Sequence, residues 1–374
     1  MNVLYGVVGE GMGHATRSSV VINHLLAQGH AVKVLASGRA NTFLRERFPD
    51  VERIHGLHIV YDDNVVQRRE TVISNLLQLP TNLTTNVSQY LALIGSFAPD
   101  VVISDFDSFA WMFAQNQGLP VISIDNMQII NRCRHDDLPP ESQADYRLTK
   151  ALVKAKLPGC AHYFITTFFS RPVRKRRTTL VPPILRDSIL NARPTDGDHV
   201  LVYQTSPTFQ ALLPALQAMT HQRFEVYGFN RDEDLGNVRL HRFSEAGFIQ
   251  NLASARAVIT NAGFTLLSEA VHLRKPVLCV PVAKQFEQVL NGHAIYTEGF
   301  GESWERLDAD LIVHFLENVP RYRAKLQGYS PEGNERLFFA LDETLTRLAR
   351  GEPLPDTFGG DEQVEDDPST QLGR

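Results

Sequence analysis

The stretch Val3-Leu-Tyr-Gly-Val-Val-Gly-Glu-Gly-Met-Gly-His14 sets the fold class, because an apolar run meets a glycine-rich turn and then a helical pattern. Residues 3–8 predict a buried strand, residues 9–13 a turn, and residues 15–28 a helix that ends at Gly29. A strand, a glycine turn and a helix in this order are typical of a parallel sheet that is covered by helices on both faces.

The same alternation of short apolar runs and helical stretches continues along the chain. It is interrupted between residues 171 and 198 by prolines, by charges and by five basic residues within 171–177, a composition that predicts a connector between domains. We therefore expect an α/β architecture of two doubly wound, Rossmann-like domains that face a cleft lined by the carboxyl ends of the strands. The predicted segments are a first domain at 1–183, a second domain with its closing helices at 184–350, and an acidic disordered tail at 351–374.

The charge distribution excludes one broad class of function. The formal net charge is -5, yet residues 351–374 alone hold seven acidic residues and one basic residue. The rest of the chain is nearly neutral, which argues against a nucleic-acid-binding domain, since such domains are clearly basic.

The spacing of the cysteines and the hydropathy of the chain argue against metal sites, disulfides and membrane-spanning segments. Cys133, Cys160 and Cys279 are widely separated and have neither metal-site nor disulfide spacing, so we expect no metal and a reduced, cytoplasmic environment. No apolar run is long enough to span a membrane, and no basic segment precedes the first strand as in a secretory signal.

The first glycine turn is similar to a dinucleotide-binding fingerprint but departs from it twice. His14 replaces the last glycine, and residues 36–38 at the end of the second strand contain no acid that could hold a ribose. His14 is instead a candidate general base, with a helix-capping role as the alternative. Asp105 and Asp107 lie at the end of a buried strand and are catalytic candidates, either to orient the imidazole or to act as the base themselves. One of the two is expected to cap the next helix.

A second motif is Thr260-Asn-Ala-Gly-Phe-Thr-Leu-Leu-Ser-Glu-Ala270, which predicts a strand end, a tight turn and a helix. Backbone N–H groups at Gly263, Phe264 and Thr265 would bind a pyrophosphate without a metal ion. Glu269 lies one helical turn after Thr265, and its carboxylate suits the two hydroxyls of a ribose, with a solvated surface charge as the alternative.

A third motif occupies residues 281–291, after the next predicted strand. Its polar side chains share one helix face and suit the hydroxyls of a sugar, because amides both donate and accept hydrogen bonds. The candidates are Glu287, Gln288 and Asn291.

Together these motifs resemble the two-domain nucleotide-sugar glycosyltransferases of the GT-B fold. The most similar pattern is that of the subgroup with the UDP-GlcNAc transferase of peptidoglycan synthesis and related lipid or polysaccharide glycosyltransferases. The resemblance implies an inverting, metal-independent transfer of a sugar from a nucleotide-diphosphate donor, such as a UDP-sugar, to an acceptor hydroxyl in cell-surface glycan or glycolipid synthesis. It implies no cofactor, since the nucleotide sugar is a co-substrate.

The resemblance also implies roles for individual residues. Residues 263–265 match the diphosphate loop, Glu269 the ribose ligand, Gln288 the sugar ligand, and His14 the histidine near the acceptor. The remaining donor-binding candidates are Gly11, Gly13, Thr205, Phe243, Phe248, Asn261, Glu287 and Asn291.

Other interpretations stay open. A nucleotide-sugar epimerase of the same fold and a non-catalytic homologue that binds a nucleotide sugar would share these motifs. The basic residues 171–177 fit either a solvated surface or peripheral contact with anionic lipids on the inner face of the plasma membrane, and the second would suit a lipid-linked acceptor.

Overall fold

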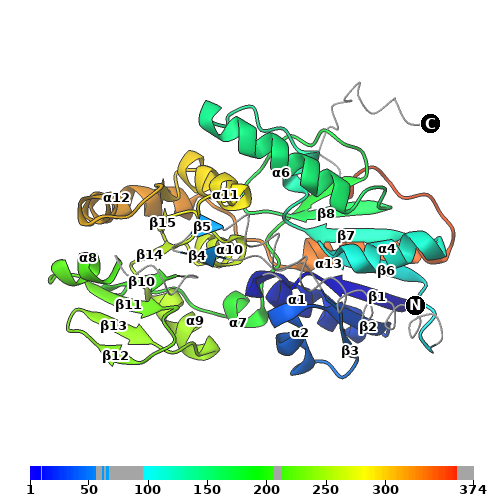
Figure 1. Ribbon diagram of the computed structural model, residues 1–374, viewed down its shortest axis with the longest axis horizontal. Helices are drawn as coiled ribbons and strands as arrows, with labels where there is room; N and C mark the ends of the chain where they lie inside the picture. The colour runs from blue at the N-terminus through cyan, green and yellow to red at the C-terminus, as the bar shows by residue number, and fades with distance from the viewer. Residues whose placement is uncertain (10, 56–60, 63–64, 67–95, 205–211, 360–374) are drawn as a thin grey trace. The chain divides into compact units, whose positions relative to one another are not determined.

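Contacts divide the chain into two compact units in the computed structural model (Figure 1). Unit 1 comprises Met1–Ile59, Arg68–Ile184 and Glu332–Arg374, and unit 2 comprises Val60–Gln67 and Leu185–Pro331. The structure describes residues 1–9, 11–55, 61–62, 65–66, 96–204 and 212–359. Each unit contains one seven-stranded, mainly parallel sheet with helices, which confirms the predicted class of two doubly wound α/β domains.

The sheet of unit 1 is parallel throughout. From one edge to the other its strands are β3 (Val51–Arg53), β2 (Ala31–Ala36), β1 (Asn2–Val7), β6 (Val101–Asp105), β7 (Val121–Asp125), β8 (His162–Thr166) and β9 (Thr178–Val181). The helical segments are α1 (Met12–Ala27), α2 (Gly38–Arg45), α4 (Ser108–Gln117), α5 (Ile129–Arg132), η1 (Pro140–Ser142), α6 (Gln143–Lys156) and α13 (Glu335–Ala349).

Strand β1 has no charged or amide side chain after Asn2, because both faces of the sheet are covered. Val3, Tyr5 and Val7 enter the core that includes residues of α1 and α13, whereas Leu4 enters the core on the side of α4. The two-residue period of the strand thus directs alternate side chains into two different cores.

Helix α13 belongs to unit 1, whereas the second domain predicted from the sequence extends to residue 350. Its Leu337, Leu341 and Leu345 share one helix face and enter the same core as β1. The sequence predicts that this helix has an apolar face, but periodicity does not specify which sheet the face covers.

Residues 351–359 are ordered against unit 1, contrary to the disorder predicted for them. The carbonyl of Asp356 and the amide of Phe358 each form a 2.9 Å hydrogen bond with β9. The buried Phe358 ring lies 4.9 and 5.6 Å from two aromatic rings of β8. The disorder was predicted from the acidic composition of this segment, but the buried Phe358 side chain holds residues 351–359 against unit 1. Residues 360–374 lie outside the described residues.

The basic residues 171–177 lie inside unit 1, between β8 and β9, and not in the connector. Arg171 pairs with Asp137 at 2.8 Å, and Arg176 pairs with Asp356 at 2.7 Å. The chain passes from unit 1 to unit 2 between Ile184 and Leu185, next to the boundary that was predicted.

The sheet of unit 2 is parallel except where β12 meets β13. Its strands in spatial order are β12 (Glu233–Asp234), β13 (Val238–His241), β11 (Arg223–Tyr227), β10 (His199–Tyr203), β14 (Ala257–Thr260), β15 (Val277–Cys279) and β16 (Gly301–Ser303). Its helices are α7 (Asp187–Leu190), α8 (Leu212–Ala218), α9 (Glu245–Ser254), α10 (Phe264–His272), α11 (Phe286–Thr297) and α12 (Ala309–Gln327). A short hairpin of β4 (Tyr61–Asp62) and β5 (Val65–Val66) is grouped with this unit.

Candidate active site

Three neighbouring strands of unit 1 end at the same edge of the sheet and bring together polar residues from distant parts of the sequence. Strand β1 leads to His14 in the first turn of α1, β6 ends at Asp105, and Asn126 directly follows β7. This edge is where open parallel sheets hold their ligands.

Two glycines permit the turn between β1 and α1. A Cβ atom on Gly9 would lie only 2.4 Å from the Oγ atom of Ser37, and Gly11 has a φ of 81°, a region that favours glycine. Gly11 immediately precedes α1 and Gly13 lies in its first turn, so the structure places both of these predicted donor ligands beside His14.

The imidazole of His14 contacts a buried carboxylate. Its Nδ1 atom lies 2.8 Å from Oδ1 of Asp105, and its side chain keeps 17 % of its surface exposed, whereas Asp105 is fully buried. A hydrogen bond from Nδ1 to this carboxylate leaves Nε2 as the basic nitrogen, which is the arrangement of a general base oriented by an acid. Nδ1 also lies 2.6 Å from an amino nitrogen of Arg17, a contact that requires the opposite tautomer.

Arg17 clamps Asp105 and was not among the site residues predicted from the sequence. Its Nε atom donates to Oδ2 at 2.8 Å and one amino nitrogen donates to Oδ1 at 2.6 Å, while the other amino group donates to Asn126 at 2.6 Å. Ser18 donates a further hydrogen bond to Oδ2 at 2.9 Å. Arg17 follows His14 by three residues on the same helix face, and this spacing was the available signal.

The clamp determines the charge of Asp105. Burial alone would raise the pKa of this carboxyl group, but Arg17 and His14 outweigh burial and hold the pKa well below its usual value. Asp105 is therefore ionised at neutral pH, and its charge stabilises an imidazolium on His14 when the ring accepts a proton.

Two other aspartates in this region serve turns. Oδ1 of Asp107 accepts from the Ala110 amide at 2.8 Å as the N-cap of α4, and Asp125 accepts from Ser123 and from the Gln128 amide. Burial raises the pKa of both aspartates. The structure thus gives Asp107 the capping role that was expected for one of the two candidates, and places Asp105 alone against His14.

The predicted diphosphate turn lies between β14 and α10 of unit 2. Gly263 occupies the N-cap position of α10, and a Cβ atom there would meet nothing within 4 Å among the described residues. Phe264 begins the helix and Thr265 follows it, so the first turn of α10 directly follows this open position.

Amide side chains brace this turn. Asn261 donates to the Val280 carbonyl and Asn291 to the Ala262 carbonyl, each at 3.0 Å. Asn291 also donates to Oε1 of Glu287 at 3.2 Å. The predicted ligands Asn261, Glu287 and Asn291 therefore take part in contacts that hold the loops in place.

Gln288 is anchored by one end of its amide. Its Oε1 atom accepts a 2.9 Å hydrogen bond from the backbone amide of Val282. This hydrogen bond fixes the orientation of the side-chain amide.

Glu269 is buried and is held by Arg186. Two guanidinium nitrogens donate to its two carboxylate oxygens at 2.9 and 3.0 Å, and the third donates to Glu245 at 2.9 Å. Burial raises the pKa of Glu269, and Arg186 opposes that shift. Arg186 lies just after the boundary between the units, within the segment that was predicted to be a connector, and it belongs to no motif. The sequence therefore contained no signal for this partner of the predicted ribose ligand.

The two predicted aromatic ligands differ in exposure. Phe248 is buried and packs edge-to-face on Tyr203 and Tyr227, with ring centroids 5.5 and 5.1 Å away. Phe243 lies 5.7 Å from Phe248 and is 58 % exposed. The structure therefore gives Phe248 a packing role; Thr205 lies outside the described residues.

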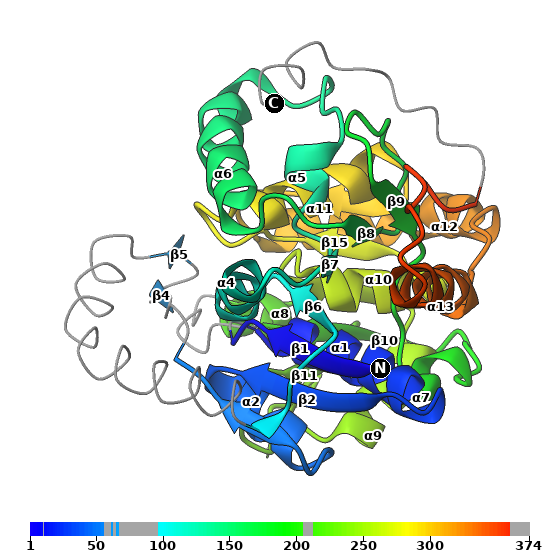
Figure 2. The same cartoon turned by 90° about the vertical axis from the view of Figure 1, so that its right-hand side faces the viewer.

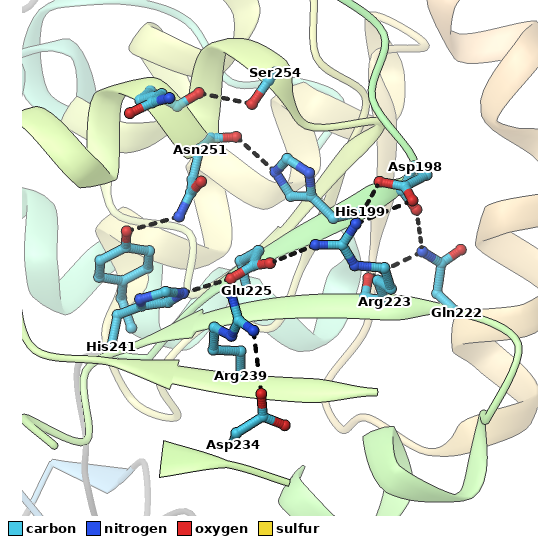
Figure 3. A network of polar contacts seen from close by, with 12 residues as sticks. Asp198, His199, Gln222, Arg223, Glu225, Asp234, Arg239, His241, Asn251 and Ser254 are labelled. Atoms are coloured by element: carbon cyan, nitrogen blue, oxygen red, sulfur yellow. Dashed lines mark hydrogen bonds and ion pairs between the residues drawn. The ribbon is translucent and has the colours of Figure 1, made fainter. Parts of the chain in front are cut away.

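A polar network supports this aromatic cluster (Figure 3). Glu225 of β11 pairs with His241 of β13 and, at 3.2 Å, with Arg223. His241 stacks on Tyr227, whose hydroxyl accepts a 2.8 Å hydrogen bond from Asn251 of α9. These contacts hold the ends of β11 and β13 together and thereby fix the position of the Tyr227 ring, on which Phe248 packs.

Comparison with known proteins identifies relatives of both sequence and fold. A family model described as glycosyl transferase family 1 matches residues 1–320. An uncharacterized glycosyltransferase of Methanosarcina mazei is 22 % identical over 365 residues, which cover 87 % of this chain and 93 % of that protein. The UDP-N-acetylglucosamine–N-acetylmuramyl-(pentapeptide) pyrophosphoryl-undecaprenol N-acetylglucosamine transferase 3 of Bacillus cereus is 28 % identical over 107 residues, 26 % of this chain. That match spans only 30 % of the Bacillus protein.

Solved structures extend the likeness to the whole fold. Phytolacca americana UGT2, complexed with UDP-2fluoro-glucose and pterostilbene, superposes with a TM-score of 0.64 at 14 % identity and covers 92 % of this chain and 98 % of that one. The glycotransferase of kitacinnamycin gives a TM-score of 0.62 at 16 % identity, with coverage of 91 % and 98 %. The architecture is therefore that of the GT-B fold.

Proposed function

The chain belongs to glycosyl transferase family 1, and from this premise we propose that it transfers a hexosyl or N-acetylhexosaminyl group from a UDP-sugar to an acceptor hydroxyl. The observation that carries the proposal is the buried, ionised Asp105 that holds the partly exposed imidazole of His14 at the ligand-binding edge of a parallel sheet. The acceptor we propose is a cell-surface glycan or a lipid-linked glycan.

The proposed reaction is a single displacement. Nε2 of His14 takes the proton of the acceptor hydroxyl while that oxygen forms a bond to the anomeric carbon. The bond from the anomeric carbon to the diphosphate oxygen breaks, the diphosphate leaves with the electron pair, and attack from the opposite side inverts the anomeric centre. Asp105 stabilises the resulting imidazolium, as a carboxylate behind a general base does.

Unit 2 supplies the groups for the donor in this proposal. The N–H groups at residues 263–265 bind the diphosphate, Glu269 accepts from the ribose, Gln288 donates to the sugar, and Phe243 stacks on the base. Because the helix N-terminus of α10 stabilises the developing negative charge, the proposal needs neither a metal ion nor a cofactor.

The decisive experiment replaces the base. We expect His14→Ala to lower turnover by about 10²- to 10⁴-fold with little change in donor affinity, because general base assistance contributes on that order. Thr16→Ala, in the same helix, is the matched control and should retain turnover. Near wild-type turnover of purified His14→Ala would remove His14 from this role, and ¹⁵N NMR of the wild type will report whether Nδ1 carries the proton.

Incubation of the protein with donor alone separates the other two functions that share these motifs. An epimerase would change the sugar without an acceptor, and a non-catalytic homologue would bind the donor with neither transfer nor hydrolysis. If the protein is a transferase, the donor should stay unchanged until an acceptor alcohol is added.

The location proposed for the acceptor is the cytoplasmic face of an anionic membrane. The support for this is the run of five bases at 171–177, which attracts acidic headgroups even though Arg171 and Arg176 also pair with carboxylates.

A further inference from the structure

A pocket opens on unit 2 beside Trp304. Its volume is about 660 Å³, and the residues that line it are Trp304, Glu305, Arg306, Asp308, Asp310 and Leu311. Pockets that hold small ligands have volumes of about 300–1,000 Å³, so this one is large enough for a ligand. The Trp304 pocket shares none of these six residues with the candidate catalytic and donor-binding groups.

The Trp304 pocket lies where strands of the parallel sheet end. Trp304 directly follows β16, and its backbone amide donates a 3.0 Å hydrogen bond to the carbonyl of Cys279, the last residue of β15. These two strands are parallel, so both end at the edge where open sheets hold ligands. The start of α12, drawn in orange in Figure 2, forms another side, and Asp308 caps this helix by accepting from the Leu311 amide at 2.9 Å.

The indole of Trp304 presents apolar surface to the pocket. Tryptophan is on average a highly buried residue, yet Trp304 is 42 % exposed. Its Nε1 group donates to Oε2 of Glu302 at 2.8 Å, and Glu302 is buried. The polar end of the indole is therefore satisfied inside the protein, and the hydrocarbon part of the ring is the part left for a ligand.

Glu302 is held in turn by α12. The hydroxyl of Tyr322 donates to Oε1 of Glu302, and Nε2 of His314 lies 3.5 Å from the same oxygen. Burial and the Glu302 carboxylate raise the pKa of Tyr322, so its hydroxyl remains a hydrogen-bond donor. Tyr322 belongs to the apolar core of unit 2. The Trp304 ring is thus fixed to the core through two buried side chains, and little conformational freedom is lost when a ligand packs on it.

The polar residues of the Trp304 pocket favour a neutral ligand that is rich in hydroxyl groups. Glu305, Asp308 and Asp310 contribute three carboxylates against the one guanidinium of Arg306, so a phosphate or another anion is repelled. Carboxylates accept hydrogen bonds from hydroxyl groups, and a guanidinium donates to hydroxyl oxygens. The C–H groups of a pyranose ring form an apolar face that packs on an indole.

We propose that the Trp304 pocket is a second, non-catalytic site that binds a neutral pyranose of an oligosaccharide. The sugar ring packs on the Trp304 indole, and the surrounding carboxylates and guanidinium form hydrogen bonds with its hydroxyl groups. This site does not depend on His14 or on the donor groups, so it would serve a transferase and a non-catalytic sugar-binding protein alike.

A cation is the other ligand that an indole beside carboxylates could bind. Sites for quaternary ammonium groups surround the cation with a cage of aromatic rings. Trp304 is the one aromatic residue among the six that line the pocket, so a cation would contact a ring on one side alone. A pyranose needs only one flat platform, which favours the sugar.

Tryptophan fluorescence tests the proposal directly, because the chain has only two tryptophans. Trp111 packs against the apolar core of unit 1, and Trp111→Phe leaves Trp304 as the single indole. The probes are three neutral trisaccharides with different linkages, namely maltotriose, cellotriose and triacetylchitotriose, at millimolar concentrations. At least one should shift the Trp304 emission to shorter wavelength in a saturable way, since stacking removes water from the ring. No response to any of the three would overturn the proposal.

Calorimetric titration with the responding trisaccharide tests the individual contacts. Trp304→Ala should weaken binding by at least about tenfold, as truncation of a central aromatic contact does, and Trp304→Tyr should bind more tightly than Trp304→Ala. Glu305→Ala/Asp310→Ala should weaken binding by about fivefold, which is typical of a lost hydrogen bond. Tyr296→Ala removes a 65 % exposed aromatic side chain of the same unit and should bind as the wild type does.

All these variants replace exposed side chains, so their thermal melts should match that of the wild type. Wild-type affinity of both Trp304→Ala and the acid variant would overturn the proposal.

Two competition experiments separate the Trp304 pocket from other sites. Saturating UDP should leave the affinity for the trisaccharide unchanged, and competition by UDP would place the sugar at the donor groups and overturn the proposal. Tetramethylammonium should not shift the Trp304 emission. A saturable shift with this cation that the trisaccharide does not reverse would make the pocket a cation site and overturn the proposal.

Discussion

Asp105 and Arg17 are both buried in unit 1, and each neutralises the other. Asp105→Asn would leave the guanidinium buried without an anion, so we expect the free energy of unfolding to fall by about 3–5 kcal/mol in urea denaturation. Asp50→Asn breaks the more exposed pair with Lys33 and should change the free energy of unfolding by less than about 1 kcal/mol. Equal, small losses in both variants would show that the clamp does not stabilise the unit.

The lowered pKa of Asp105 also makes a prediction for acid stability. Its folded-state pKa lies below the ordinary value of 3.8, so its contribution is complete above about pH 4 and is lost as the pH falls further towards the folded-state pKa. The difference in unfolding free energy between the wild type and Asp105→Asn should therefore be constant from pH 7 to about pH 5 and shrink below about pH 4. A difference that persists unchanged at pH 3 would contradict an ionised Asp105.

The bidentate pair of Arg186 and Glu269 is suited to a double-mutant cycle. Arg186→Ala leaves a buried carboxylate unpaired and should destabilise the chain by about 3–5 kcal/mol at pH 7. Adding Glu269→Gln removes that charge and should recover part of the loss, which gives a favourable coupling energy. Additive effects would mean that the two side chains do not interact in solution, and Arg239→Ala, at an exposed pair with Asp234, is the control with little effect.

At the scale of elements, the segment after α13 depends on one side chain. Phe358→Ala removes a buried ring from the core of unit 1 and should destabilise the chain by about 3–5 kcal/mol in thermal or urea unfolding. Phe339→Ala removes the same side chain from a 72 % exposed position of α13 and should change stability by less than about 0.5 kcal/mol. Equal stability of the two variants would show that residues 351–359 are not held against β9.

The sequence predicts the elements whose local pattern is strong and misses those that depend on distant partners. Strand β1 is evident because an unbroken apolar run precedes a glycine turn. Strand β9 is missed because its four residues follow five bases, and only pairing with β8 makes them a strand. Phe358 is a single aromatic residue in an acidic stretch, so composition alone predicts disorder there. Its contacts with the aromatic residues of β8 are evident only in the folded structure.

Some contacts of the candidate site could likewise be predicted from the sequence, whereas others could not. The meeting of His14 and Asp105 follows from the common edge of parallel strands, although 91 residues separate them. The pairing of Arg186 with Glu269 follows no spacing rule, because the two residues are 83 positions apart and Arg186 lies outside regular structure. Whether an aromatic residue such as Phe248 is exposed is decided by the packing of three elements, and no local pattern specifies it.

At the scale of the molecule, the two units close their cores differently. The core of unit 2 is built from residues 200–322, whereas that of unit 1 also requires Leu337, Leu341, Leu345 and Phe358. We expect residues 185–331, expressed alone, to unfold cooperatively and residues 1–184 to lack a cooperative transition until a fragment of residues 332–359 is supplied. Circular dichroism melts of the three samples check this, and a cooperative melt of residues 1–184 alone would contradict it.

The return of α13 to the first sheet has a consequence during synthesis on the ribosome. The strands of unit 1 emerge first, but the helix that closes their core is translated after the whole of residues 185–331. Since translation proceeds at about 5–20 residues per second, the apolar face of that sheet stays without α13 for on the order of 10–30 s. The half of the protein that is made first is thus completed last, and the nascent chain exposes a surface that chaperones bind throughout that interval.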